Sequence, residues 1–122
     1  MRSVKKLIVV GDRVLVTPED PDSMTKSGLY LPPSVQEKEK IQSGYIVKAG
    51  PGYAIPNPTF EDEPWVEAKE PIKYIPLQVE EGDYVIFMTS QGIEVAFEEQ
   101  TYIIVPHAAI LLIVRNELLP SQ

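Results

Sequence analysis

Proline and glycine interrupt this chain so often that they limit the length of any regular element. Twelve prolines and seven glycines stand among 122 residues. Proline removes a backbone donor and fixes φ, so it is disfavoured inside helices and in central strands. Apolar residues also recur at every second position more clearly than at every third or fourth, which is the period of a half-buried strand. The sequence therefore predicts an all-β fold of short strands, a small sandwich or barrel.

Runs of apolar residues between turn residues are predicted to be strands, and the chain is long enough for one domain, residues 1–122, with a modest core. The runs are Leu7–Val10, Arg13–Thr17, Tyr45–Lys48, Tyr84–Phe87, Ile93–Phe97, Tyr102–Val105 and Ile110–Val114. Residues 106–109 are expected to form a turn or a single helical turn. The first and last runs either pair with each other within one chain or form edges that pair with neighbouring subunits. The sequence leaves both arrangements open.

Residues 19–43 form a long segment without a clean hydrophobic period. The segment holds a small apolar island, Leu29-Tyr30-Leu31, followed by two prolines and an alternation of Glu and Lys. A helical turn over Ser34–Lys40 is one interpretation, but a long exposed loop is favoured, and such loops are usually functional. The competing interpretation of the island is an ordinary strand packed in the core.

Residues 51–76 form a second irregular segment, in which Tyr53–Pro76 alone carries five prolines. We expect an excursion from the main sheet. Its aromatic and acidic members are Phe60, Glu61, Asp62, Glu63 and Trp65.

Composition argues against several functions. The chain contains no cysteine, which excludes disulfides, thiolate nucleophiles and cysteine-based zinc sites. A net charge of −7 with scattered basic residues argues against nucleic-acid binding. No apolar run approaches the ~20 residues that span a bilayer, and the start of the chain does not resemble a signal peptide. A cytoplasmic protein without a membrane partner is favoured, and an organelle stays open.

Catalytic chemistry has little support in the sequence. The chain contains a single histidine, His107. A Ser-His-Asp catalytic triad of Ser90, His107 and Asp83 is conceivable from the residue types, but no Gly-x-Ser-x-Gly motif is present to support it. Gly50-Pro51-Gly52 is interpreted as a turn, since a phosphate loop requires a lysine and a following helix. We expect no catalytic residue, no metal site and no cofactor.

Five blocks of the sequence resemble, in order, segments of the GroES-type co-chaperonin family, also called the 10 kDa chaperonin family. They are Gly11-Asp12-Arg13-Val14-Leu15-Val16, Thr25-Lys26-Ser27-Gly28-Leu29-Tyr30-Leu31-Pro32, Gly44–Gly52, Val79–Phe87 and Ile110–Val114. Each block alone is weakly specific, but five in the family's order are specific. The resemblance implies a small irregular GroES-like β-barrel with a long mobile loop and a roof hairpin. It also implies a homo-heptameric dome that caps an ATP-bound chaperonin of the GroEL type and encloses non-native substrate proteins. The chaperonin, not the dome, would hydrolyse the ATP.

The resemblance also implies roles for particular residues. The chaperonin-binding residues of the loop would be Thr25, Lys26, Ser27, Gly28, Leu29, Tyr30, Leu31 and Pro32. The inter-subunit strands would be Leu7, Ile8, Val9 and Val10 of one subunit and Ile110, Leu111, Leu112, Ile113 and Val114 of its neighbour. The roof would contain Phe60, Glu61, Asp62, Glu63 and Trp65.

Two features depart from the family pattern. The roof segment is longer, with residues 57–71 as the extra part, and is either an enlarged solvated loop or a surface that contacts substrate or narrows the orifice. Tyr30 occupies the middle of a loop tripeptide that is usually aliphatic or Met there. The alternative function is a stand-alone β-barrel binding module that no longer caps a chaperonin.

Overall fold

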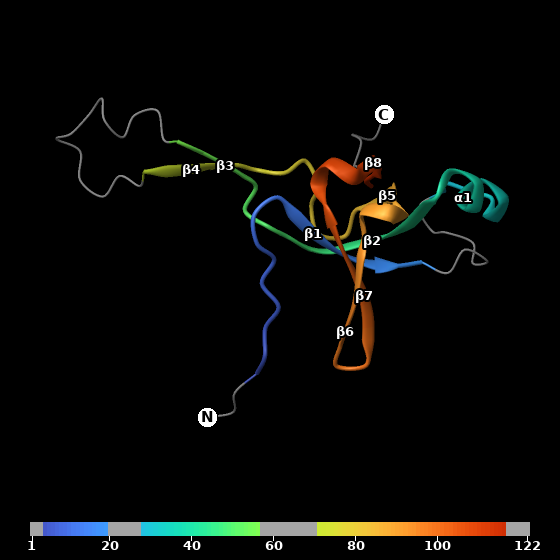
Figure 1. Ribbon diagram of the computed structural model, residues 1–122, viewed down its shortest axis with the longest axis horizontal. Helices are drawn as coiled ribbons and strands as arrows, with labels where there is room; N and C mark the ends of the chain where they lie inside the picture. Colours follow the sequence, from blue (N-terminus) through green and yellow to red (C-terminus); the bar gives the residue numbers. More distant parts are fainter. Residues whose placement is uncertain (1–3, 20–27, 57–70, 117–122) are drawn as a thin grey trace, which may run out of the picture.

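The computed structural model describes residues 4–19, 28–56 and 71–116 (Figure 1). Its elements are β1 (Arg13–Pro18), α1 (Pro33–Glu39), β2 (Ile41–Ala49), β3 (Tyr53–Pro56), β4 (Ile72–Ile75), β5 (Tyr84–Met88), η1 (Thr89–Gln91), β6 (Ile93–Phe97), β7 (Gln100–Pro106), η2 (His107–Ala109) and β8 (Ile110–Val114). Strands predominate, so the all-β class is confirmed, as is the single helical turn before the last strand. No helix in the described ranges is long and apolar enough to cross a membrane.

The main sheet has six strands in the order β6-β7-β1-β2-β5-β8, and every neighbouring pair is antiparallel. Its register shifts between Leu15 and Val16, opposite β2, and between Ile86 and Phe87, opposite β8. Such irregularities bend a strand and increase its twist. Over the described residues the sheet is not closed into the expected barrel, because β6 and β8 are not hydrogen-bonded to each other.

The hydrophobic core lies on one face of this sheet. Alternating residues of the central strands point to the same side, and they meet Val79 and Ala109 from the connections. The buried cluster consists of Val14, Val16, Ile46, Val79, Val85, Phe87, Ile103, Val105 and Ala109. Burying one such Val, Ile or Phe side chain stabilises the fold by roughly 1.5–3 kcal/mol, so this cluster holds β1, β2, β5 and β7 together, and Ile110 and Ile113 of β8 pack against it.

Strands β3 and β4 form a separate two-stranded ribbon that projects from the main sheet, on the side opposite α1 (Figure 1). Tyr53 pairs with Ile75 at its base and Pro56 with Ile72 at its far end. The ribbon starts at Gly52, where φ is +120° and a Cβ atom would collide with the carbonyl oxygen of Ile75. The excursion therefore begins as a hairpin. The predicted roof residues Phe60, Glu61, Asp62, Glu63 and Trp65 lie outside the described residues.

The favoured loop over residues 34–40 is wrong in part, because Pro33–Glu39 forms helix α1. Proline is well placed in a first helical turn, where its missing N–H has no intrahelical partner. Lys40 ends the helix in a left-handed conformation with φ 55°, and its N–H donates to the carbonyl of Gln36. The helix thus forms because Pro33 favours its first turn and Lys40 caps its end, although the segment has only a weak hydrophobic period.

The predicted strand Leu7–Val10 is also absent, since residues 4–10 form no strand in the single chain. A strand needs a partner for its backbone N–H and C=O groups. Within the chain, Ile110–Val114 gives its hydrogen bonds to β5 and not to residues 7–10. Pairing of the first and last runs within one chain is therefore excluded.

Candidate functional site

The N-terminal segment, residues 4–10, exposes apolar side chains at alternate positions. Val4, Ile8 and Val10 are 81%, 75% and 76% exposed, whereas Leu7 and Val9 are partly buried. This period of two is that of a strand with one covered face. The segment therefore has the side-chain pattern of a strand but lacks a hydrogen-bonding partner strand in the described part of the chain.

Strand β8 supplies a complementary edge. It pairs with β5 on one side, and no described strand pairs with its other side. Ile110 and Ile113 pack against the core, while Leu111 and Leu112 are exposed. An unpaired edge with exposed apolar side chains is a ready template for another chain.

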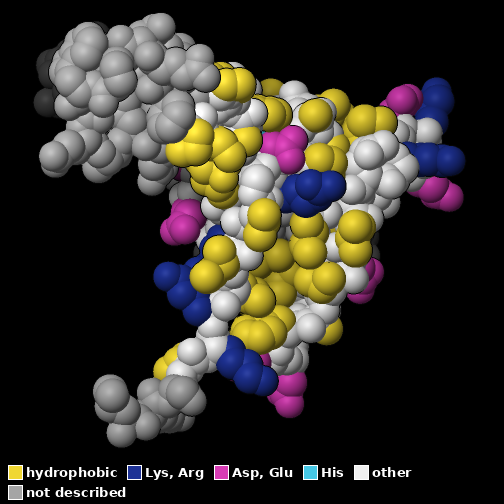
Figure 2. Space-filling view, turned by 60° about the vertical axis from the view of Figure 1, so that its left-hand side comes forward, with side chains coloured by type: hydrophobic (Ala, Val, Ile, Leu, Met, Phe, Trp, Pro, Cys, Tyr) yellow, Lys and Arg dark blue, Asp and Glu magenta, His cyan; other side chains and the backbone are white. Residues whose placement is uncertain are grey.

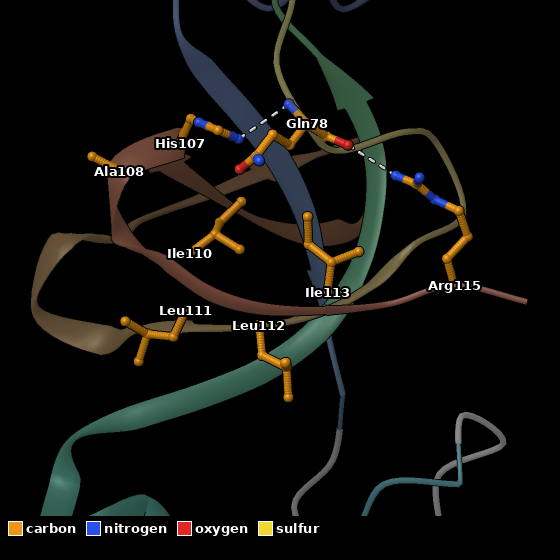
Figure 3. A pocket seen from close by; sticks show the side chains of 8 residues that line it. All are labelled: Gln78, His107, Ala108, Ile110, Leu111, Leu112, Ile113 and Arg115. Atoms are coloured by element: carbon orange, nitrogen blue, oxygen red, sulfur yellow. Dashed lines mark hydrogen bonds between the residues drawn. The ribbon is translucent and has the colours of Figure 1, made fainter.

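A groove of about 590 Å³ runs beside this edge (Figure 3). The side chains of β8 line its length, with His107 at one end and Arg115 at the other, and Gln78 lies between these two. Figure 2 shows apolar side chains gathered on one face between the N-terminal end and the base of the ribbon, with charged side chains at the margins. Patches of this kind mark contacts with other proteins.

Arg115 forms an ion pair with the buried Asp83. Its Nε donates to Asp83 Oδ1 at 2.8 Å and its Nη2 to Oδ2 at 2.7 Å, and the N–H of Glu80 also donates to Oδ2 at 2.7 Å. Burial raises the pKa of Asp83, but the hydrogen bonds from Arg115 and Glu80 outweigh it, so the pKa lies below its ordinary value. The aspartate of the Gly82-Asp83 turn thus anchors the end of β8.

His107 joins the ribbon to the main sheet. Its Nδ1 lies 2.9 Å from the hydroxyl of Tyr53, and the backbone N–H of Gln78 donates to its Nε2 at 3.3 Å. Both ring nitrogens therefore contact groups other than Ser90 and Asp83, and a catalytic triad of these three residues is not formed. Within the described ranges, no group of three or more His, Cys, Asp or Glu residues is arranged to hold a metal.

The described part of the predicted loop lies outside the core. Leu29-Tyr30-Leu31 forms no strand, and the side chain of Tyr30 is 68% exposed. Gly28 has φ +84°, a conformation that glycine adopts without strain. Gln36 of α1 donates to the carbonyl of Leu31 at 2.9 Å and so fixes the end of the segment. The remaining loop residues Thr25, Lys26 and Ser27 lie outside the described residues.

Sequence reasoning missed Gln78 and Arg115 as parts of this site. Arg115 lies 32 positions from Asp83, and no local pattern predicts such a pair. Gln78 acts through its backbone, which carries no signal in the residue type. The block Val79–Phe87 contained one signal for this part of the site. A Gly-Asp turn before a buried strand places a carboxylate near a sheet edge, and that carboxylate is Asp83.

The fold and the site define a small all-β protein with an apolar strand edge, an apolar N-terminal segment and an apolar loop tripeptide outside the core. These surfaces suit contact with other protein chains. The chain belongs to the family described as chaperonin 10 kDa subunit, whose model matches residues 6–64 and 66–114.

Curated relatives agree with this assignment. The chain is 34% identical over 108 residues to a protein named Co-chaperonin GroES from Coprothermobacter proteolyticus, and the match covers 88% of this chain and 94% of the relative. It is 39% identical over 106 residues to the protein of that name from Listeria welshimeri (87% and 96%). It is 33% identical over 112 residues to the one from Rhodothermus marinus (92% and 95%). The resemblance found in the five sequence blocks is confirmed.

Proposed function

We propose that the chain is a co-chaperonin subunit that caps a chaperonin of the GroEL type through residues 25–32. The observation that carries the proposal is the family match over nearly the whole chain. The position of Leu29-Tyr30-Leu31 outside the core supports the role of the loop. The protein would act in the cytoplasm as a lid over non-native substrate proteins, without a catalytic site or nucleotide of its own. A stand-alone binding module is not favoured, since the matched relatives carry the name of the co-chaperonin.

The lid would be a ring of seven subunits. Residues 7–10 of one subunit would pair with the free edge of β8 in the next, and this head-to-tail contact closes when its rotation matches the symmetry. The exposed Ile8 and Val10 and the side of β8 that no described strand pairs support this arrangement. The ribbon of β3 and β4 would form the base of the roof hairpin, because it projects from the main sheet on the side opposite α1 (Figure 1).

Capping by such loops needs several copies. Burying Leu29 and Leu31 would contribute roughly 1.5–3 kcal/mol each, while ordering a free segment costs about 2–5 kcal/mol. One loop therefore binds weakly. Seven tethered loops bind tightly through effective concentration, and each can still be released when the chaperonin changes shape.

A double substitution, Leu29→Ser with Leu31→Ser, tests the loop. We expect a full loss of binding to a GroEL-type chaperonin with ATP, measured by pull-down, and an unchanged ring by native mass spectrometry. Val35→Ser is the matched control, because Val35 is an exposed apolar residue on the neighbouring α1. Unchanged chaperonin binding by the double variant would show that another segment binds. Loss of folded protein would place these two leucines in the core.

Ile8→Asp tests the ring. Ile8 is 75% exposed in the single chain, so the substitution should leave the subunit folded and convert rings into monomers. Val35→Asp serves as the control, since it places the same charge at an exposed apolar side chain of α1, which belongs to neither edge. A heptamer that persisted in the Ile8→Asp variant would exclude residues 7–10 from the interface.

A further inference from the structure

A chain of polar contacts connects the ribbon to the end of β8. It runs from the hydroxyl of Tyr53 to His107, from His107 to the backbone N–H of Gln78, and from the carbonyl of Gln78 to Nη2 of Arg115 at 2.8 Å. Arg115 continues it to the buried Asp83. In Figure 3 the peptide of Gln78 lies between His107 and Arg115, above the side chains of β8. One set of contacts therefore spans the ribbon and both ends of the groove.

The contacts of His107 define its tautomer. An amide N–H is only a donor, so Nε2 of His107 accepts the hydrogen bond from Gln78 and carries no proton. The proton is on Nδ1, which donates to the hydroxyl of Tyr53. The backbone N–H of His107 donates to the carbonyl of Asp12 at 2.8 Å, and its ring meets the Tyr53 ring edge-on with 5.8 Å between centroids. The ring is thus held by the ribbon and by the segment that contains Gln78, and its backbone by the turn before β1.

The ribbon depends on this connection. A two-stranded ribbon is marginally stable by itself, and β3 and β4 pair only with each other among the described strands. Tyr53, Ile72, Tyr74 and Ile75 are all more than a third exposed, so little core packing fixes the ribbon's direction. The hydrogen bond from His107 to Tyr53 is its polar contact with the segment that leads directly into β8.

We propose that His107 is a positioning residue that couples the orientation of the ribbon to the neighbour-binding edge of β8. The inference rests on the proposed function, in which β8 binds the next subunit.

Charged groups around His107 come from each element packed against it. Asp12, in the turn before β1, forms an ion pair at 3.7 Å with Arg13, the first residue of β1. Lys73 of β4 is on the same face of the ribbon as Tyr53 by the strand register, and Arg115 lies beyond Gln78, paired with Asp83 and Glu80. Among the described residues no carboxylate contacts the ring nitrogens, since these meet Tyr53 and Gln78.

The test compares the wild-type protein with His107→Phe, which keeps an aromatic ring but removes the hydrogen bonds of the imidazole to Tyr53 and Gln78. Loss of one hydrogen bond corresponds to about a fivefold change in an equilibrium constant. We expect the ring dissociation constant of His107→Phe, measured by sedimentation, to be about fivefold higher than that of the wild-type protein or more. An unchanged constant in folded His107→Phe would overturn the proposal.

Hydrogen exchange tests the coupling from the other side. Tyr53→Phe removes one hydroxyl and should raise both the ring dissociation constant and the corrected amide exchange in β3 and β4 by about fivefold at pH 8. Tyr74→Phe makes the same change on the same ribbon, at a side chain with no hydrogen bond to another described residue, and should change neither. Faster exchange with unchanged dissociation in Tyr53→Phe would refute the coupling. A wild-type protein that forms no ring at pH 8 would instead contradict the proposed function, and ribbon exchange in its monomer would still test the contact of Tyr53 with His107.

Discussion

Replacement of Arg115 by Met should destabilise the subunit strongly, because it leaves the carboxylate of Asp83 buried without its cation. Asp83 is 3% exposed and receives two hydrogen bonds from Arg115 and one from the N–H of Glu80. Of these three, the Glu80 contact alone survives the substitution. Methionine keeps most of the apolar stem of the side chain, so the loss is mainly electrostatic.

The magnitude follows from the exposure of the two partners. Breaking a buried ion pair by removing one partner costs about 3–5 kcal/mol. The Arg115 side chain is 42% exposed, so water can approach the carboxylate of Asp83 in the variant and offset part of that cost. We expect a loss of about 2–3 kcal/mol, which for a chain of this size lowers Tm by roughly 6–12 °C.

Thermal unfolding at a fixed subunit concentration is the assay, since ring dissociation also shifts Tm. Arg13→Met is the matched control, because Arg13 pairs with Asp12 at 3.7 Å on the surface, and such pairs contribute about 0–1 kcal/mol. Adding Asp83→Asn to Arg115→Met removes the unpaired charge and should restore part of the loss. Equal shifts in Arg115→Met and Arg13→Met would refute the reasoning.

The pH dependence of the same variant has a defined sign. Burial raises the pKa of Asp83, but the hydrogen bonds from Arg115 and Glu80 outweigh it, so the pKa is lowered in the folded chain. The stabilisation is therefore fully present above the ordinary carboxyl pKa of about 3.9 and is lost as the pH falls through the lower folded value. The stability difference between wild type and Arg115→Met should be largest near neutral pH and shrink below about pH 4.

Two further predictions concern the ribbon. Gly52→Ala forces a Cβ against the carbonyl of Ile75 and should cost more than Gly82→Ala, where the φ is also positive but the space is open; calorimetry compares the two, and equal losses would contradict the clash. Deleting residues 57–71 should leave rings and chaperonin binding intact, and it should reduce ring dissociation at low salt. Seven chains at −7 each carry −49, and at physiological salt the repulsion between these charges is screened beyond about 8 Å. Sedimentation across a salt series measures this, and a broken ring would make the excursion an assembly element.

The sequence predicted the parts of the fold that depend on local pattern. The strand runs Arg13–Thr17, Tyr84–Phe87 and Ile93–Phe97 were predicted within one residue of β1, β5 and β6, because period two and turn residues are local signals. Residues 7–10 were apolar enough to predict a strand, but hydrogen bonding needs a second strand that the single chain does not supply. The contact of Asp83 with Arg115 could not be predicted, since it depends on the β5–β8 register.

Helix α1 shows the other limit of local reasoning. None of its seven residues is buried, so the sequence has no hydrophobic period there that would predict a helix. The helix is instead defined by Pro33 at its start and by the left-handed Lys40 at its end. Both residues stand in the printed sequence, but a lysine is not a typical residue for a left-handed C-cap.

The part played by Gln78 has a consequence for how this protein can diverge. Both of its contacts, with His107 and with Arg115, are made by peptide atoms, which every amino acid except proline provides in full. Most residue types can therefore replace Gln78 while both hydrogen bonds of its backbone are kept. A comparison of related sequences would show position 78 as variable. Proline would break the hydrogen bond to His107, because it has no backbone N–H. We therefore expect that selection on this contact is visible only as the absence of proline at position 78.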